Sequence, residues 1–214
     1  MNLEPQSRAR RKLGAAARKS GRTLKARGVA SLPPALFVTD PVRTPDPEII
    51  AAGLPRGFGV VYRHFGAPGH ASVAKRLAAI CRPRGVILLI AADPQLAARV
   101  GADGVHWPFR LRQNVRRWRS RFGLQTLSAH SGRELRAIAG LPVEAVLVST
   151  VFASRSPSAG SAMGPLRFAR LAALSEKPVY ALGGITAETA GSVSRWSGYA
   201  AVEGLTAFRP QIRT

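Results

Sequence analysis

The sequence predicts an α/β protein with a (β/α)8 TIM barrel, and three observations support this fold class. From residue 35 onward, short β-branched and apolar runs alternate with Ala-, Leu- and Arg-rich segments of helical period. The apolar runs are nearly continuous, which indicates strands that are buried on both faces. Eight such runs fit within about 180 residues, which is compact but sufficient for a barrel. A doubly wound open sheet is the alternative.

The eight expected strands are separated by segments with recognisable helix boundaries. Pro94 stands near the start of one expected helix, and Gly140 follows the end of another. Few residues follow the eighth strand and they include Pro210, so the eighth helix is expected to be incomplete, or another segment covers that flank. The strands are expected at residues 35–40, 58–65, 85–92, 103–107, 124–130, 144–150, 178–184 and 198–205.

Residues 1–31 are expected to form a basic N-terminal arm, and residues 32–214 the barrel. Nine lysines and arginines lie within residues 1–30. The apolar residues of this segment are too sparse for a strong core-facing stripe, which favours a solvated, partly disordered arm. The alternative is a single helix that covers the flank left open by the last βα unit.

The composition excludes several classes of protein. No stretch reaches the roughly 18 consecutive apolar residues of a membrane-spanning helix, and no apolar segment follows the N-terminal arginines. We therefore expect a soluble, cytoplasmic protein without a membrane partner. The single cysteine, Cys81, excludes a disulfide within the chain and is expected to be a small buried apolar residue rather than a nucleophile.

The formal net charge of +21 suggests nucleic acid as a further class of partner. Six arginines lie within residues 110–121, interleaved with aromatic side chains, in a pattern that is compatible with RNA contact. Together with residues 1–30, this segment is the candidate nucleic-acid surface. The alternative is a surface helix whose aromatic side chains face the strands and whose arginines face water.

The strand ends carry the functional motifs, because the active site of such a barrel lies at the carboxyl ends of its strands. They read VTD (38–40), GADGVH (101–106), SAH (128–130), VFASRS (151–156) and ALGGI (181–185). In that order and spacing they resemble the thiamine-phosphate synthase and thiazole tautomerase superfamily over residues 32–208. For the synthase, the resemblance implies that hydroxymethylpyrimidine diphosphate loses pyrophosphate and is joined to the nitrogen of thiazole phosphate.

The resemblance also implies Mg²⁺ bound by two aspartates, but this chain has Ala92 and Leu111 at those positions. No metal site and no cofactor are therefore predicted. Asp93 is expected to cap the following helix instead. Two lysines of the family pattern are also replaced, by Phe65 and Pro157.

The resemblance assigns candidate site residues to the remaining strand ends. Arg63 matches the arginine that faces the diphosphate, and burial of such a charge in an apolar strand would be costly without an anion. Small hydroxyl side chains and glycine amides suit phosphate oxygens because they donate hydrogen bonds without crowding, and Thr186 is expected to cap a helix behind the glycines. The expected catalytic residues are Arg63, Ser128 and His106; the expected phosphate- and substrate-binding residues are Ser154, Arg155, Ser156, Gly183, Gly184 and His130.

Three functions remain open on these residues. The first is a diverged synthase in which arginines replace Mg²⁺ and the lysines, with thiazole phosphate, pyrimidine diphosphate and thiamine phosphate as ligands. The second is a barrel that binds phosphate esters without catalysis. The third is a tautomerase-like isomerase that uses His106 or His130 as its base, since Thr150 occupies the position of the tautomerase histidine.

Overall fold

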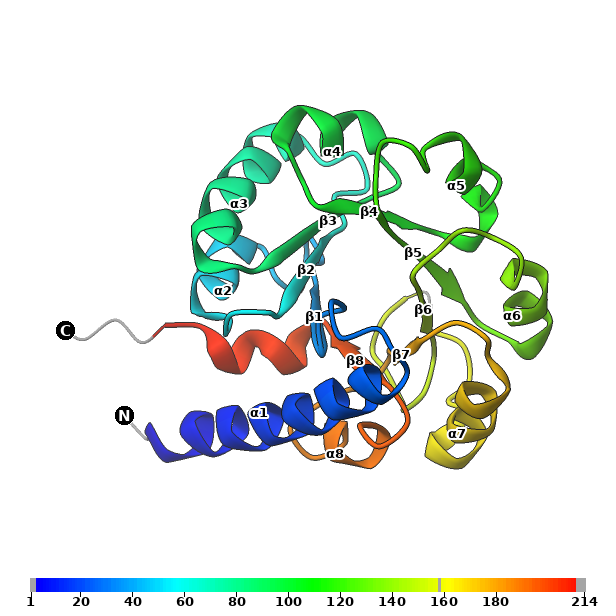
Figure 1. Cartoon of the computed structure of the whole chain (residues 1–214). Helices are drawn as coiled ribbons and strands as arrows, with labels where there is room; N and C mark the ends of the chain where they lie inside the picture. The colour runs from blue at the N-terminus through cyan, green and yellow to red at the C-terminus, as the bar shows by residue number, and fades with distance from the viewer. Residues whose placement is uncertain (1–2, 158, 211–214) are drawn as a thin grey trace.

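A closed barrel of eight parallel strands forms the centre of the molecule in the computed structural model, which describes residues 3–157 and 159–210 (Figure 1). The strands follow one another around the barrel in chain order, and β1 pairs with β8 through Leu36 opposite Ala200. This closure confirms the TIM barrel and excludes the open sheet. The strands are β1 (Ala35–Val38), β2 (Gly59–Tyr62), β3 (Ile87–Ala91), β4 (Gly104–Trp107), β5 (Leu124–Ala129), β6 (Ala145–Val148), β7 (Val179–Ala181) and β8 (Gly198–Ala201).

Helices surround the barrel and begin where the sequence places caps. Asp93 accepts a hydrogen bond from the Leu96 amide at 2.8 Å and Pro94 opens the helix, so the expected cap is confirmed. The helices after β1 are α2 (Pro47–Gly53), α3 (His70–Arg84), α4 (Pro94–Val100), η1 (Phe109–Leu111), α5 (Asn114–Arg117), α6 (Gly132–Ile138), α7 (Gly164–Leu174), α8 (Ala190–Val193) and η2 (Glu203–Phe208).

Both faces of the strands are buried, which explains their continuous apolar sequence. Phe37 and Leu88 face the surrounding helices, whereas Leu36 and Leu89 fill the barrel interior. Tyr180 is also inside, and its hydroxyl donates to the Pro33 carbonyl at 2.6 Å, which closes the end of the barrel where the strands begin. Space for a ligand is therefore left at the opposite end.

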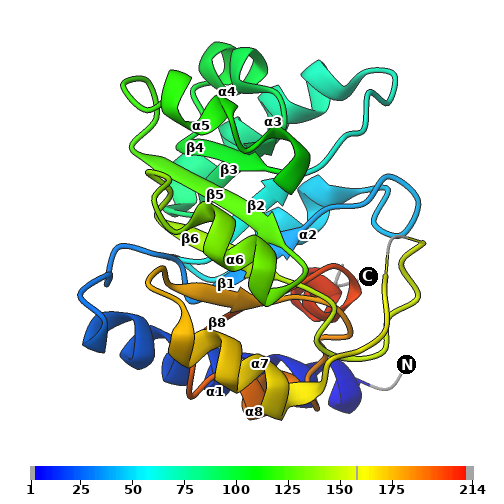
Figure 2. The same ribbon diagram turned by 90° about the vertical axis from the view of Figure 1, so that its right-hand side faces the viewer.

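The N-terminal segment is a helix, α1 (Leu3–Ala26), that lies along β8, α8 and η2 (Figures 1 and 2). This corrects the solvated arm that the composition favours for residues 3–26. Leu13 and Leu24 are buried, and Ala16 and Ala17 let the helix approach closely, so few large apolar residues are needed. Within the described residues, the short η2 follows β8, and α1 covers the flank beside them. A boundary between residues 31 and 32 stays a prediction.

The two ends of the described chain are joined through α1. The side chains of Gln6 and Arg10 both donate hydrogen bonds to the carbonyl oxygens of Ala207 and Arg209. The Tyr199 hydroxyl on β8 donates to the Leu13 carbonyl at 2.9 Å. Among the described helices, none is long and apolar enough to cross a membrane.

Candidate functional site

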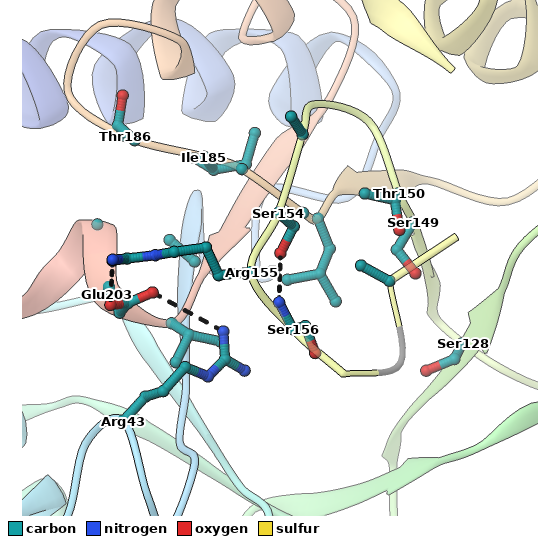
Figure 3. A pocket seen from close by; sticks show the side chains of 18 of the residues that line it. Arg43, Ser128, Ser149, Thr150, Ser154, Arg155, Ser156, Ile185, Thr186 and Glu203 are labelled. Carbon is teal, nitrogen blue, oxygen red and sulfur yellow. Dashed lines mark hydrogen bonds and ion pairs between the residues drawn. The ribbon is translucent and has the colours of Figure 1, made fainter. Parts of the chain in front are cut away.

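A pocket of about 260 Å³ opens at the carboxyl ends of the strands (Figure 3). Within the described chain, its wall contains every predicted site residue except His106. Several strands end earlier than expected, so that pocket residues such as Arg63, Thr150 and Gly183 lie in loops, whereas Ser128 lies within β5. The polar and glycine residues of the wall are Arg43, Arg63, Ser128, His130, Ser149, Thr150, Ser154, Arg155, Ser156, Gly183, Gly184, Thr186, Glu203 and Gly204.

A chain of alternating charges crosses one side of the pocket. Asp40 pairs with two arginines, its Oδ2 lying 2.8 Å from Arg43 Nη2 and 3.5 Å from Arg63 Nη2. Glu203 also lies between two arginines, with Oε1 2.7 Å from Arg155 Nη2 and Oε2 3.9 Å from Arg43 Nη1 (Figure 3). Three cations thus meet two carboxylates, and the resulting excess of positive charge favours a bound anion.

Burial and neighbouring charges shift the pKa values of Asp40 and Arg63. Burial opposes ionisation of Asp40, but the hydrogen bonds and charge of Arg43 outweigh it and hold the pKa of the carboxyl below its usual value. Burial also lowers the pKa of Arg63, against the opposing effect of Asp40, yet a guanidinium stays charged in proteins. Arg63 Nε donates to the Thr39 carbonyl at 3.0 Å, which fixes one edge of the guanidinium at the pocket wall.

His106 lies behind the pocket and holds Ser128. Its Nε2 is 2.9 Å from Ser128 Oγ and its Nδ1 is 2.9 Å from Thr126 Oγ1, so both ring nitrogens are bonded to hydroxyls. Burial, followed by the charge of Arg63, lowers the pKa of His106 to about 3. His106 itself does not line the pocket in the described chain, but its neutral ring is hydrogen-bonded to Ser128, which does. Contact between His106 and a ligand stays a prediction.

Two loops lie against each other in the pocket wall, and the Phe152 amide donates to the Gly183 carbonyl at 3.0 Å. In the loop after β6, Ser154 Oγ accepts the Ser156 amide at 3.3 Å (Figure 3). In the loop after β7, Gly183 and Gly184 have φ angles of +95° and +62°. A Cβ at Gly184 would lie 2.4 Å from the Ala153 carbonyl oxygen, so only glycine lets the two loops meet. The amides of both glycines have no hydrogen-bond acceptor within residues 3–157 and 159–210.

Two expected details of these loops are different in the structure. Thr186 does not cap a helix, because α8 begins only at Ala190 and Thr189 precedes it. The Thr189 hydroxyl instead accepts the Thr186 amide at 2.8 Å and donates to the Gly184 carbonyl. His130 lies at the half-exposed rim, where its Nδ1 is 3.2 Å from Glu134 Oε2, and this pairing directs the ring toward α6.

The positions that bind Mg²⁺ in the resembling family do not fit a metal in this chain. Ala92 is exposed beside β3 and Leu111 packs partly against the outer core, and neither side chain has a ligand atom. Phe65, at one of the lysine positions, is 73% exposed and lies against Arg63, whose guanidinium carbon is 5.3 Å from the ring centre.

Sequence reasoning missed Arg43, which links the two carboxylates of the charge chain. The signal was present in VTDPVRT, because Asp40 ends the first strand and Arg43 follows it by three residues in a tight turn. The Val42 and Arg43 amides both donate to Asp40 Oδ1, which brings the Arg43 side chain back over the strand end.

Comparisons with known proteins agree with the motifs. The sequence pattern of the family described as "Thiamine monophosphate synthase" matches residues 36–205. A thiamine-phosphate synthase of Geobacillus thermodenitrificans is 34% identical over 127 residues, which make up 57% of this chain and 57% of that protein. One of Chromobacterium violaceum is 35% identical over 122 residues, 55% of this chain and 58% of that protein. The chain thus spans a little over half the length of these curated relatives.

Solved structures show the same fold. A thiamine phosphate pyrophosphorylase from Pyrococcus furiosus superposes with a TM-score of 0.67 at 17% identity, covering 84% of this chain and 93% of that chain. FabK from Thermotoga maritima superposes with a TM-score of 0.63 at 12% identity, covering 82% of this chain and 59% of that chain. At these low sequence identities, the likeness to both structures supports the barrel fold and nothing more specific.

Proposed function

Because the chain belongs to the thiamine monophosphate synthase family, we propose that it binds phosphorylated thiamine precursors in the barrel pocket and joins them. In this reaction the bond between the pyrimidine methylene carbon and the diphosphate breaks. The thiazole nitrogen forms a new bond to that carbon, and pyrophosphate leaves. The observation that carries the proposal is the excess of arginine over carboxylate at a pocket lined with serine hydroxyls and glycine amides.

The two phosphate groups are assigned to different sides of the pocket. Arg63, Arg43 and Ser128 would bind the diphosphate, and their charges would stabilise the departing pyrophosphate. Arg43 Nε supports this assignment, because it is buried without a partner in the described part of the chain and a phosphate oxygen would supply the missing acceptor. His106 serves as a positioning residue for Ser128.

The opposite side of the pocket suits the thiazole phosphate. Ser154 and Ser156 offer hydroxyls, and the amides of Gly183 and Gly184 offer donors that need no side chain. Arg155 and Glu203 lie at the edge of this side, where Glu203 occupies one face of the Arg155 guanidinium.

The test is a coupled measurement of product and binding with the full chain. Incubation with hydroxymethylpyrimidine diphosphate and thiazole phosphate should release pyrophosphate and yield thiamine phosphate, detected by mass spectrometry. Arg63→Gln should lower the rate by at least about 100-fold, the usual scale for loss of a group that stabilises departing charge. The exposed Arg133→Gln on α6 is the matched control and should leave the rate unchanged.

A second function, phosphate-ester binding without turnover, is favoured by the loss of both metal-ligand positions at Ala92 and Leu111. It predicts calorimetric binding of thiazole phosphate or thiamine phosphate but no product at high protein concentration, with or without Mg²⁺. Absence of both product and binding would reject both functions. The tautomerase alternative loses one of its two candidate bases, because His106 is buried and neutral. Thr150 has no acid or base, so this alternative would depend on His130 at the pocket rim.

A further inference from the structure

Three potential metal ligands gather outside the pocket, at the rim between β2 and β3. His64 follows β2, His70 begins α3, and Asp93 follows β3. The two strands are parallel neighbours, so their carboxyl ends bring these residues to one edge of the barrel. One ligand atom from each residue lies within 4.8 Å of the others, and this is the sole such group of three in the described chain.

The ring nitrogens of the two histidines differ in their hydrogen-bond partners. His70 Nδ1 is 2.8 Å from the Ala67 carbonyl, to which it must donate, so Nε2 carries a free lone pair. A histidine that ligates a metal commonly donates its other nitrogen to a backbone carbonyl in this way. His64 Nε2 is buried and has no partner within the described residues, although a buried polar nitrogen is normally satisfied.

Asp93 completes the group with a carboxylate oxygen. Its Oδ1 accepts the Leu96 amide, which fixes the side chain, while Oδ2 has no hydrogen-bond donor among the described residues. The histidine rings are stacked with centroids 4.4 Å apart and an angle of 10° between their planes. The backbone is held in the left-handed region on both sides of the group, at Phe65 (φ +48°) and Ala92 (φ +61°). His64 and Asp93 thus each adjoin a residue of left-handed backbone conformation, whereas His70 is the first residue of α3.

We propose that His64, His70 and Asp93 form a binding site for a divalent transition-metal ion such as Zn²⁺. Two imidazole nitrogens and one carboxylate suit a borderline-soft ion, whereas Mg²⁺ prefers oxygen ligands and keeps several waters. Three protein ligands leave a fourth coordination position open to water. This replaces the expectation of no metal, with ligands different from the aspartates of the family. It does not rest on the proposed function, because none of the three residues lines the pocket wall in the described chain.

Metal binding requires two local changes at His64. The ring must turn out of the stack with His70, because the nitrogen lone pairs of two parallel rings cannot point at one ion, and its proton must change position. Nδ1 of this ring accepts the Gly66 amide at 3.0 Å, so the proton of the neutral ring resides on Nε2. For Nε2 to bind the metal, this proton moves to Nδ1 and the Gly66 amide turns away. Gly66 has a φ angle of +77° and a Cβ there would meet open space, so the turn has room to move. We therefore expect the loop at residues 65–69 to change its amide signals when the metal binds.

The test is calorimetric titration of Zn²⁺ into the full chain after removal of metal by chelation. We expect one ion per chain, binding that is unaffected by excess Mg²⁺, and visible absorption bands when Co²⁺ is used instead. His64→Gln and His70→Gln should each weaken Zn²⁺ binding by roughly 100-fold or more, above the 10- to 100-fold typical of outer-shell changes. Asp93→Asn should weaken it by at least about 10-fold on the same scale, while asparagine retains the helix cap.

His130→Gln is the control, because this histidine pairs with Glu134 away from the three proposed ligands. It should bind Zn²⁺ as the unaltered chain does. Far-UV circular dichroism and the urea midpoint of each metal-free variant check that it folds. If a histidine variant does not fold, Asp93→Asn still tests the site, because asparagine preserves the helix cap. Failure of the unaltered chain to bind Zn²⁺, or unchanged binding by the Asp93→Asn and His64→Gln variants, would overturn the proposal.

Discussion

Glu203 is a carboxylate inside a pocket proposed to bind phosphate, and its two arginines explain how it is tolerated. It neutralises Arg155 and, at longer range, Arg43, so an incoming phosphate ester must compete with it for these cations. Glu203→Gln should therefore raise the affinity for thiazole phosphate by about two- to fivefold at low salt, the scale of a partly exposed ion pair. Calorimetry measures the change.

The matched control for that substitution is Glu176→Gln, since Glu176 is exposed between α7 and β7 and does not line the pocket in the described chain. It should leave the affinity unchanged. Weaker binding by Glu203→Gln would contradict the competition and would mean that Glu203 itself contacts the ligand.

Gly184 is the residue at which the two phosphate-side loops touch. Alanine there has to adopt a φ of +62° and to push the Ala153 carbonyl aside, so the loop after β6 must move. Gly184→Ala should reduce thiazole phosphate affinity by about 10-fold or more, whereas Gly140→Ala, which has open space around its Cβ, should have no effect. Unchanged affinity in Gly184→Ala would show that this loop contact does not shape the site.

His106 makes the stability of the protein depend on pH. Its folded pKa of about 3 lies below the ordinary value of 6.5, so between these values the unfolded chain binds a proton that the folded chain excludes. Stability should fall as the pH drops from about 6.5 toward 3, by up to ~1.4 kcal/mol per pH unit.

His106→Asn removes this dependence and should give a flatter curve in urea unfolding measured between pH 7 and 4.5. The pKa of His64 is also lowered, first by burial, but His64 is present in both proteins and its contribution cancels in the comparison. Parallel curves for the two proteins would show that His106 is not the group responsible.

Sequence reasoning located the pocket residues that end strands, because strand ends are recognisable and converge in a barrel. Arg63, Ser128 and Gly183 were found in this way. It did not predict that Ser128 lines the pocket while His106 lies behind it. The two residues lie on the neighbouring strands β4 and β5, and which side chain is more deeply buried depends on tertiary packing. The His64, His70 and Asp93 group was missed because its residues come from two different connections, between β2 and α3 and between β3 and α4, and each residue has an ordinary local explanation.

At the scale of elements, α1 is held on the barrel by few large side chains. Leu13 is fully buried, so Leu13→Ala should cost about 2–5 kcal/mol of unfolding free energy through reduced burial and the cavity left behind. The exposed Arg18→Ala on the same helix should change stability by less than about 0.5 kcal/mol. Urea unfolding of both variants distinguishes a docked helix from a loose one, and equal effects would contradict docking.

The sequence indicated the strands better than this helix. A strand buried on both faces has a distinctive apolar composition, whereas α1 buries a narrow stripe of alanines and two leucines among basic residues. Its partners, β8 and η2, are formed about 190 residues later, so no local pattern reports the contact.

For the whole molecule, the positive charge is divided between distant surfaces. Figures 1 and 2 place α1 and α5 on opposite sides of the barrel, so residues 1–30 and 110–121 do not form one continuous nucleic-acid surface. Nucleic-acid binding stays a prediction. Its test should replace basic side chains rather than shorten the protein, because removing residues 1–30 would also remove the buried Leu13 and Leu24.

We expect the full chain to bind RNA without sequence preference at low salt, owing to its net charge of +21. Replacing the exposed Arg11, Arg18, Arg22 and Lys25 with glutamine should reduce the salt dependence of that binding, by up to about 0.7 in the logarithmic slope for each RNA phosphate that is no longer neutralised. An unchanged slope would exclude α1 as the RNA-binding surface.

The bonds from α1 to β8 and η2 also order the events of folding on the ribosome. The helix is synthesised 186 to 203 residues before the Tyr199, Ala207 and Arg209 groups that it contacts. Domains begin to fold while synthesis continues, and exposed apolar surface promotes aggregation in that interval. Until those later residues are synthesised, α1 is exposed. In that interval it presents little apolar surface and many basic side chains. We expect the basic residues of α1 to keep this segment dispersed in the nascent chain until its docking surface exists.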